Sequence, residues 1–219
     1  CGSLCDVVLL APPGSGQETL EYLEHANLFI VPLDNERHWF RYHHLFADLL
    51  RQRLQRSSTL STGKEKGGVD ELHRRASEWY EHNGLPSDAI RHALAAEDFE
   101  RAATLIELAE PEMRRSRQGA TVTELGWLKA LPDELVHFRP VLSVAYAFAL
   151  FGSGELGGVE PRLRDAERWL DTTADTAGMV VVDEEEFRRL PGMIALLRAA
   201  QALARGDMPE AVKNARRVL

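Results

Sequence analysis

The sequence lacks the features that define several specialised classes of protein. Only two cysteines, Cys1 and Cys5, occur among the 219 residues, so no disulfide framework is indicated and a reducing compartment is expected. No apolar run approaches the ~20 residues that a membrane-spanning helix needs, and no signal peptide is present. These absences predict a cytoplasmic protein without a membrane partner.

Residue clusters for metal binding and catalysis are also lacking. Cys1 and Cys5 have no second pair of ligands at the spacing of a zinc site. His43 and His44 are adjacent, and adjacent side chains in a strand point to opposite faces, so they make a poor metal site. No serine or cysteine lies in a nucleophile elbow, and no glycine-rich phosphate loop occurs. We therefore expect no metal, no catalytic residue and no enzymatic activity in this chain.

The composition that remains is ordinary for a globular protein, with 44% hydrophobic and 27% charged residues. The net charge of −8 argues against nucleic-acid binding by the whole chain. The chain begins at Cys1 and stops within "EAVKNARRVL", which has the pattern of an unfinished helix. We interpret the sequence as a piece of a longer protein.

Residues 1–56 have the pattern of the C-terminal part of a winged-helix domain. Residues 17–26 place apolar side chains near helical spacing. The stretches "NLFIVPL" and "WFRYH" are typical of strands, and Asp34–His38 supplies turn residues at the length of a hairpin loop. From His44 onward leucines recur at helical spacing, with arginines outside them. Helix, β-hairpin and helix in this order predict the end of a winged helix.

The rest of the chain is predicted to be helical. Residues 57–68, "SSTLSTGKEKGG", are small, polar and rich in glycine, which predicts a linker. Residues 69–219 then have helical spacing, interrupted by a loop over residues 171–183. The expected fold class is mainly α: a short winged-helix piece with one β-hairpin, followed by a truncated α-helical solenoid of the tetratricopeptide (TPR) type.

The solenoid prediction depends on a repeated pattern. A glycine is followed by four residues of any kind, then by a small or apolar residue, and a second small or apolar residue stands four positions after the first. The copies are Gly84–Ala89–Ala93, Gly154–Val159–Leu163 and Gly206–Ala211–Ala215, with Glu97–Ala102–Ile106 as a degenerate copy. Glycine permits a tight turn between antiparallel helices, and small residues let the helices approach closely. The copies are irregularly spaced, so a generic helical bundle is the alternative.

Stacked helical repeats form a concave surface that usually binds a ligand. We therefore expect a small-molecule inducer or a regulatory protein to bind the repeats, and an exposed apolar repeat end could also lead to self-association. Six aromatic residues are candidates for stacking on a ligand, although aromatic residues at helical spacing are more often core. They are Trp79, Tyr80, Trp127, Tyr146, Phe148 and Trp169.

Two other functions stay open at this point. A repeat scaffold that binds only other proteins would show no saturable binding of small molecules. A DNA-binding winged helix is favoured by the five arginines between residues 37 and 56. The mixed charge of Asp34–His38, at the tip of the expected wing, argues against DNA binding.

Three segments, residues 26–54, 71–107 and 125–150, resemble the large MalT-like regulators of the LuxR family. These are ATP-dependent bacterial transcription activators of the STAND class. The resemblance implies an upstream P-loop module that binds ATP or ADP, a winged helix, a TPR-like superhelix for the inducer, and a C-terminal helix-turn-helix for promoters. This chain would hold the end of the winged helix and the start of the superhelix. Nucleotide and DNA would then bind to other parts of the parent protein.

The resemblance also implies a role for His43. Related STAND switch proteins carry a Met-His-Asp motif at this place in the winged helix, and Tyr42-His43-His44 is similar in position. His43 would contact the β-phosphate of ADP and hold the closed state, because an imidazole N–H is a suitable donor to phosphate. His44 stands where the motif has aspartate.

Overall fold

The structure is a computed structural model that describes residues 1–60, 66–115, 121–170 and 177–217. It divides into two compact units, unit 1 (Cys1–Asp98) and unit 2 (Phe99–Leu219), and each is described by itself. The fold is mainly α with one β-hairpin, which confirms the predicted class. None of the described helices is long and apolar enough to cross a membrane.

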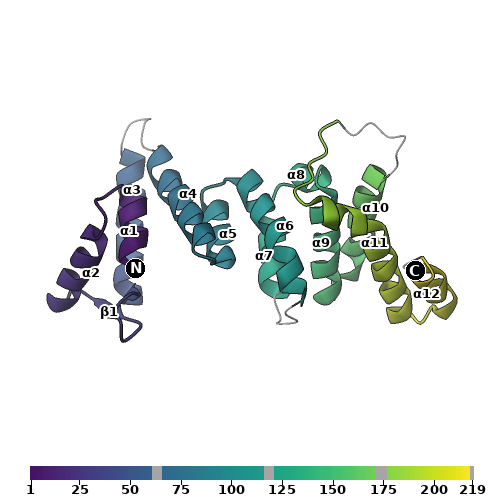
Figure 1. Ribbon diagram of the computed structural model, residues 1–219, viewed down its shortest axis with the longest axis horizontal. Coiled ribbons are helices and arrows are strands. Elements are labelled where there is room, and N and C mark those ends of the chain that lie inside the picture. Colours follow the sequence, from purple (N-terminus) through teal and green to yellow (C-terminus); the bar gives the residue numbers. More distant parts are fainter. Residues whose placement is uncertain (61–65, 116–120, 171–176, 218–219) are drawn as a thin grey trace. The chain divides into compact units, whose positions relative to one another are not determined.

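Unit 1 contains the β-hairpin and one pair of antiparallel helices (Figure 1). Its elements are α1 (Gly2–Leu9), α2 (Ser15–His25), β1 (Ile30–Pro32), β2 (Phe40–Tyr42), α3 (His44–Leu60), α4 (Lys66–His82) and α5 (Pro86–Ala95). The predicted order of helix, hairpin and helix is confirmed, whereas α1 was not predicted. Within the expected linker, residues 61–65 lie outside the described residues, α3 ends at Leu60 and α4 begins at Lys66.

Two glycines let α1 and α2 cross closely. A Cβ atom on Gly16 would lie only 2.4 Å from the backbone oxygen of Gly2, so neither position has room for a side chain. The Asp6 carboxylate fixes the start of α2, because it accepts the backbone N–H groups of Gly14 at 2.8 Å and Gly16 at 2.6 Å. This crossing positions α2, which leads directly into the hairpin.

The hairpin forms because its loop residues satisfy their own backbone. The Asp34 carboxylate accepts the N–H groups of His38 at 2.8 Å and Trp39 at 3.0 Å, which closes the turn predicted from the sequence. The strands pair antiparallel, with Val31 directly opposite Arg41. Ile30 is 5% exposed and Val31 is 48% exposed, so one face of the hairpin lies in the core and the other is open.

Unit 2 is built around α9, a strongly apolar helix. Ten of its thirteen residues are buried, and it packs against α7, α10 and α11. The elements are α6 (Phe99–Arg115), α7 (Thr121–Ala130), α8 (Asp133–His137), α9 (Pro140–Gly152), η1 (Leu156–Gly158), α10 (Val159–Glu167), η2 (Arg168–Leu170), α11 (Glu184–Ala204) and α12 (Met208–Ala215).

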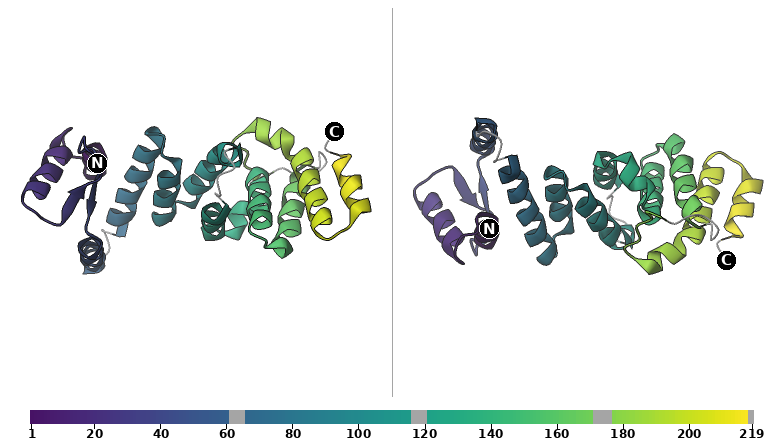
Figure 2. Two further views of the ribbon diagram at one scale, coloured as in Figure 1. Left: turned by 90° about the horizontal axis from the view of Figure 1, so that it is seen from below. Right: turned by 90° about the horizontal axis from the view of Figure 1, so that it is seen from above.

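The helices of unit 2 form antiparallel pairs, and α9 with α10 and α11 with α12 lie side by side (Figure 2). Residues 177–183, between η2 and α11, are irregular, as the expected loop requires, while residues 171–176 lie outside the described part of the chain. Consecutive antiparallel pairs of this kind within unit 2 agree with the helical solenoid predicted from the sequence.

The predicted repeat has a common turn geometry. The turn residue has a positive φ at Gly84 (71°), Gly154 (81°) and Gly206 (76°), and also at Glu97 (54°). In each turn the next residue donates its N–H to a carbonyl five residues back. These bonds are Leu85 to Tyr80 (2.9 Å), Asp98 to Ala93 (3.0 Å), Glu155 to Leu150 (2.9 Å) and Asp207 to Ala202 (2.9 Å). The degenerate copy therefore forms the same helix-ending turn as the glycine copies.

Candidate functional site

The histidine selected from the sequence lies in a hollow of about 640 Å³ on unit 1. The hairpin and the first turns of α3 form its walls. The residues that line it include Phe29, Val31, Arg41, His43, His44 and Arg51.

The backbone of His43 is fixed on both sides. Its N–H donates to the carbonyl of Phe29 at 2.7 Å, next to the hairpin, and its carbonyl accepts the N–H of Ala47 at 3.0 Å, which starts α3. The imidazole is exposed and has no hydrogen bond within the described residues. The side chain is therefore free to meet a ligand while its attachment point is held.

The expectation that His43 and His44 point to opposite faces is wrong. Their ring centroids are 4.4 Å apart. The alternation rule fails here because β2 ends at Tyr42 and α3 begins at His44, so His43 is not a strand residue.

The charges in the hollow are all of one sign. Arg41 lies opposite Val31 in the hairpin register, and Arg51 pairs with Asp48 at 2.8 Å while its side chain stays 72% exposed. No acidic residue is among the described residues that line the hollow. Two guanidinium groups and two imidazoles form a set of donors suited to an anion such as phosphate. Sequence reasoning selected the histidines and missed the role of Arg41, because its position opposite Val31 depends on the hairpin register.

Apolar side chains surround this basic hollow. Phe29 has a φ of 58°, which costs a bulky residue about 1–2 kcal/mol, and yet its side chain is 60% exposed. Backbone strain of this kind is typical of functional positions. Other exposed apolar residues lie on the hairpin and α3, namely Val31, Leu33, Leu45 and Leu49. Such a surface is typical of a contact with another protein module.

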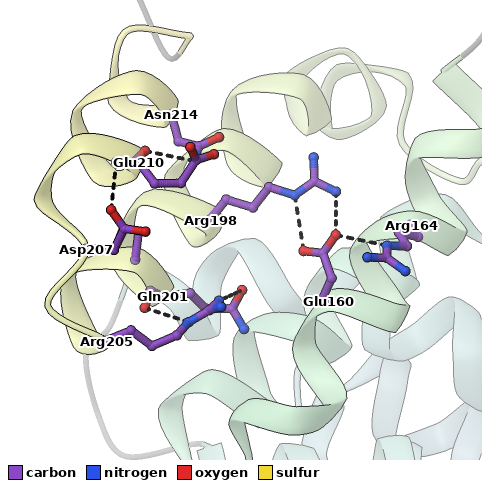
Figure 3. Close-up of a pocket in the computed structure, with 9 residues that line it drawn as sticks. Glu160, Arg164, Arg198, Gln201, Arg205, Asp207, Glu210 and Asn214 are labelled. Atoms are coloured by element: carbon purple, nitrogen blue, oxygen red, sulfur yellow. Dashed lines mark hydrogen bonds and ion pairs between the residues drawn. The ribbon is translucent and has the colours of Figure 1, made fainter.

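Unit 2 carries a second candidate site, a groove of about 500 Å³ between α10, α11 and α12 (Figure 3). On one side Glu160 lies between Arg198 (Nη2 to Oε1, 3.0 Å) and Arg164 (Nε to Oε1, 3.1 Å). On the other side Asn214 donates to the Glu210 carboxylate at 3.1 Å. Donors and acceptors therefore alternate around the groove, which suits a polar ligand rather than an apolar one.

Arg198 is the anchor of this groove. Its side chain is 19% exposed, and it pairs with Glu160 and with Glu167 (Nη1 to Oε1, 2.7 Å). The hydrogen bonds that Arg198 donates to Glu167 lower the pKa of Glu167, and those that it donates to Glu167 and Glu160 raise its own pKa. The ion pairs therefore stay charged and hold α10 against α11. Sequence reasoning missed this groove because glutamates and arginines at helical spacing usually mark a solvated face.

None of the six aromatic candidates is among the described residues that line this groove. Tyr80 and Tyr146 are buried, and Arg162 covers the Tyr146 ring at 4.5 Å. Trp79 packs edge-on against Trp39, with ring centroids 6.2 Å apart. These rings serve packing in the described structure.

The chain matches known proteins over nearly its whole length. Residues 1–61 match the family described as MalT winged helix domain. The HTH-type transcriptional regulator MalT of Klebsiella pneumoniae (strain 342) is 31% identical over 95% of this chain and 21% of its own length. MalT of Serratia proteamaculans is 32% identical over 97% of this chain and 22% of its own length.

A kinase also contains a similar segment. The serine/threonine-protein kinase PknK of Mycobacterium tuberculosis (strain H37Rv) is 37% identical over 80% of this chain and 15% of its own length. The chain therefore spans about a fifth or less of the curated relatives that it matches. No solved structure matches it.

Proposed function

Because residues 1–61 belong to the MalT winged-helix family and most of the chain resembles MalT regulators, we propose that it is the switching and signal-receiving part of a bacterial transcription regulator. Unit 1 couples to a nucleotide-binding module, and unit 2 receives an inducer or a partner protein. Such coupling requires an effector that binds one conformational state better than the other. ATP or ADP and promoter DNA would bind elsewhere in a cytoplasmic parent protein.

The hollow around His43 supports the nucleotide half of this proposal. An exposed imidazole without a hydrogen bond among the described residues stands beside Arg41 and Arg51. We assign His43 the role of donor to the β-phosphate of ADP. The exposed apolar side chains around the hollow would pack against the module that holds the nucleotide, since surfaces of this kind usually mark a contact.

The groove of α10, α11 and α12 supports the inducer half. Its buried amides Gln201 and Asn214, each 3% exposed, lie between ion pairs and offer a rigid polar surface. We assign this groove to a small ligand with several hydroxyl or charged groups. Isothermal calorimetry with sugars and polar metabolites tests this assignment, and Arg198→Met provides a matched variant with a damaged groove.

The His43 assignment predicts the behaviour of the full-length parent. His43→Ala removes one hydrogen bond to a charged group, worth about 1.5–3 kcal/mol, so ADP binding should weaken by about 10- to 100-fold. The parent should then activate transcription without inducer. Equilibrium dialysis with ADP and a reporter assay measure the two effects.

Two variants control this experiment. His82→Ala changes an exposed histidine whose Nδ1 lies 2.7 Å from the Glu78 carbonyl on α4, and it should leave both readouts unchanged. His43→Gln keeps an N–H donor and should retain part of the ADP affinity. Normal inducer dependence in His43→Ala would contradict the nucleotide role.

The kinase relative favours one alternative, in which the segment is a scaffold for protein partners. A segment of this type occurs in proteins named for transcription regulation and for kinase activity, and a shared scaffold would serve both. In that case calorimetry finds no small ligand, and pull-down recovers a defined protein partner. A gel shift at low salt separately tests DNA binding by unit 1, which we expect to be absent.

A further inference from the structure

Unit 2 buries an unusual number of carboxylates at one place. Glu107 and Glu110 of α6, Glu124 of α7 and Glu186 of α11 are 2%, 5%, 8% and 4% exposed. We call these four residues the carboxylate cluster. Buried glutamates are rare unless they are paired, so the partners of each one decide what the cluster does.

Two arginines supply the positive charge. Arg114 of α6 donates to Glu110 at 3.0 Å and to Glu186 at 2.8 Å, so it joins α6 to α11. Arg139, at the start of α9, donates to Glu107 at 3.0 Å and is itself 4% exposed. Four buried carboxylates therefore face two arginines that approach from inside the unit.

Two carboxylates of the cluster have fewer partners than the others, namely Glu124 and Glu107. Glu124 makes no hydrogen bond or ion pair within the described residues, although Glu110 and Arg114 act on it electrostatically. Oε2 of Glu107 is buried without a partner at hydrogen-bond geometry, although the backbone N–H of Val182 lies close enough to lower the pKa of Glu107. Glu124 therefore lacks the contacts that would stabilise it as an anion, whereas Glu107 keeps Arg139 on its other oxygen.

The pKa values of Glu124 and Glu107 are both raised. Burial, assisted by Glu110, raises the pKa of Glu124 to about 7. Burial also raises the pKa of Glu107 to about 7, against the lowering effect of Arg139. Burial raises the pKa of Glu110 as well.

The surrounding elements add few other charges. On the outer side Arg139 also reaches Glu100, which is 72% exposed at its side chain, and Arg189 of α11 pairs with Glu186. Helix α9 (Pro140–Gly152) has no charged residue between its ends. With one proton bound, on Glu124, the three carboxylates of the cluster that stay charged balance the three arginines.

The cluster lies where the chain before α11 meets α6. The N–H of Val180 donates to the carbonyl of Phe138 at 2.9 Å, next to Arg139. Asp183 caps α11 by accepting the N–H of Glu185 at 2.8 Å, and the same first turn carries Glu186. Residues 180–190 are thus held on α6 partly through groups of the cluster.

We propose that the carboxylate cluster is a proton-linked clamp: with a proton on Glu124, Arg114 holds residues 180–190 against α6 through Glu186, and loss of this proton loosens that contact. The reason is charge balance, because the lost proton adds a buried negative charge beside Arg114 that no further arginine matches. Arg114 is then shared among three carboxylates instead of two.

The direction of the pH effect follows from the two pKa values. Both carboxyls hold their protons more tightly in the folded chain than in the unfolded chain, where the value is 4.5. Their stabilising contribution is complete below about pH 4.5, falls as the pH rises toward about 7, and stays low above it.

Hydrogen exchange of residues 180–193 in the 219-residue chain tests the clamp. After correction for the intrinsic exchange rate, amide protection of this segment should fall about 10-fold between pH 5 and pH 8. Glu124→Gln keeps the shape and removes the titrating group, so most of this pH dependence should disappear. Glu134→Gln, an exposed glutamate of α8, serves as the matched control and should behave as the unchanged chain.

The clamp is overturned if Glu124→Gln and the unchanged chain lose protection equally between pH 5 and pH 8. If Glu124→Gln does not fold, Glu124→Met replaces it in the same measurement. A reduced pH dependence in Glu124→Met supports the clamp, and an unchanged one overturns it. A purely structural role for Glu124 would shift protection at every pH and leave its pH dependence intact.

Discussion

Unit 1 and unit 2 bury opposite kinds of side chain. Among the described residues of unit 1, Ser77 is the buried polar side chain, and its hydroxyl donates to the Ala89 carbonyl at 2.8 Å. The same unit leaves large apolar residues exposed along the hairpin and α3. Unit 2 instead buries four glutamates and Arg139. Unit 1 therefore exposes an apolar surface on which a partner could pack, whereas unit 2 buries charged side chains that must balance one another.

The two units also differ in how they respond to pH. In unit 1 the Nδ1 atoms of His73 and His92 lie 2.8 Å apart, and the His92 ring stacks on Tyr80 at 5.2 Å. Burial lowers the pKa of both histidines, and that of His92 to about 4. Acid therefore weakens unit 1, which must protonate buried bases, while higher pH weakens unit 2, which must ionise buried acids.

The largest effect on stability should come from removing Arg139, whose ion pair with Glu107 is deeply buried. Arg139→Met leaves Glu107 without its partner and should lower the free energy of unfolding of unit 2 by about 3–5 kcal/mol at pH 8. The loss should be smaller at pH 5, where Glu107 is protonated. Urea unfolding followed by Trp127 and Trp169, with Trp39 and Trp79 replaced by phenylalanine, isolates the signal of unit 2.

Arg164→Met is the matched control for this change in the same unit. Arg164 is 74% exposed and pairs with Glu160 on the surface, so its loss should change stability by less than about 1 kcal/mol. Equal losses of unfolding free energy in the two variants would show that the buried and the exposed ion pair contribute equally to stability.

A smaller effect should appear in unit 1 at acid pH. The pKa of His92 is lowered in the folded chain, so its stabilising contribution is complete above about pH 6.5 and is lost as the pH falls toward about 4. After allowance for solvent screening, we expect a loss of about 1 kcal/mol. His92→Gln should flatten this dependence in urea unfolding followed by Trp39 and Trp79, whereas His82→Gln should not. The same acid sensitivity in both variants would show that other groups control it.

The smallest effect should come from the exposed apolar surface of unit 1. Leu49 is 58% exposed, so Leu49→Gln should change stability by about 0.5 kcal/mol or less. Leu142→Ala, at a position with no exposure in α9, is the contrasting change and should cost about 2–5 kcal/mol. A large loss from Leu49→Gln in thermal unfolding would mean that this surface is already covered within the chain.

The sequence predicts the elements that depend on local pattern. The Asp34–His38 turn, the apolar helix α9 and the positive-φ turns at Gly84, Gly154 and Gly206 all follow from short-range rules, and all are present. The repeat pattern even identified the turn at Glu97, which has no glycine. The sequence analysis selected His43 but not the hollow around it, because one wall of the hollow depends on the pairing of Val31 with Arg41.

Long-range burial is what the sequence did not reveal. Glu107, Glu110 and Glu124 have the spacing of ordinary surface residues, and their burial depends on where α9 and α11 pack. Helix α6 also continues through Pro111 to Arg115. A proline removes one backbone donor and usually ends a helix, so local pattern rules alone would end this helix too early.

The position of the turn at Glu97 affects how the two units could be exchanged between proteins by recombination. The division between the two compact units falls directly after it, at Asp98 and Phe99. The turn is closed by backbone bonds from Glu97 to Leu94 and from Asp98 to Ala93, and the Asp98 carboxylate pairs with Arg74 of the same unit. A gene crossover after Asp98 would therefore pass on one whole unit and leave the internal contacts of the other intact.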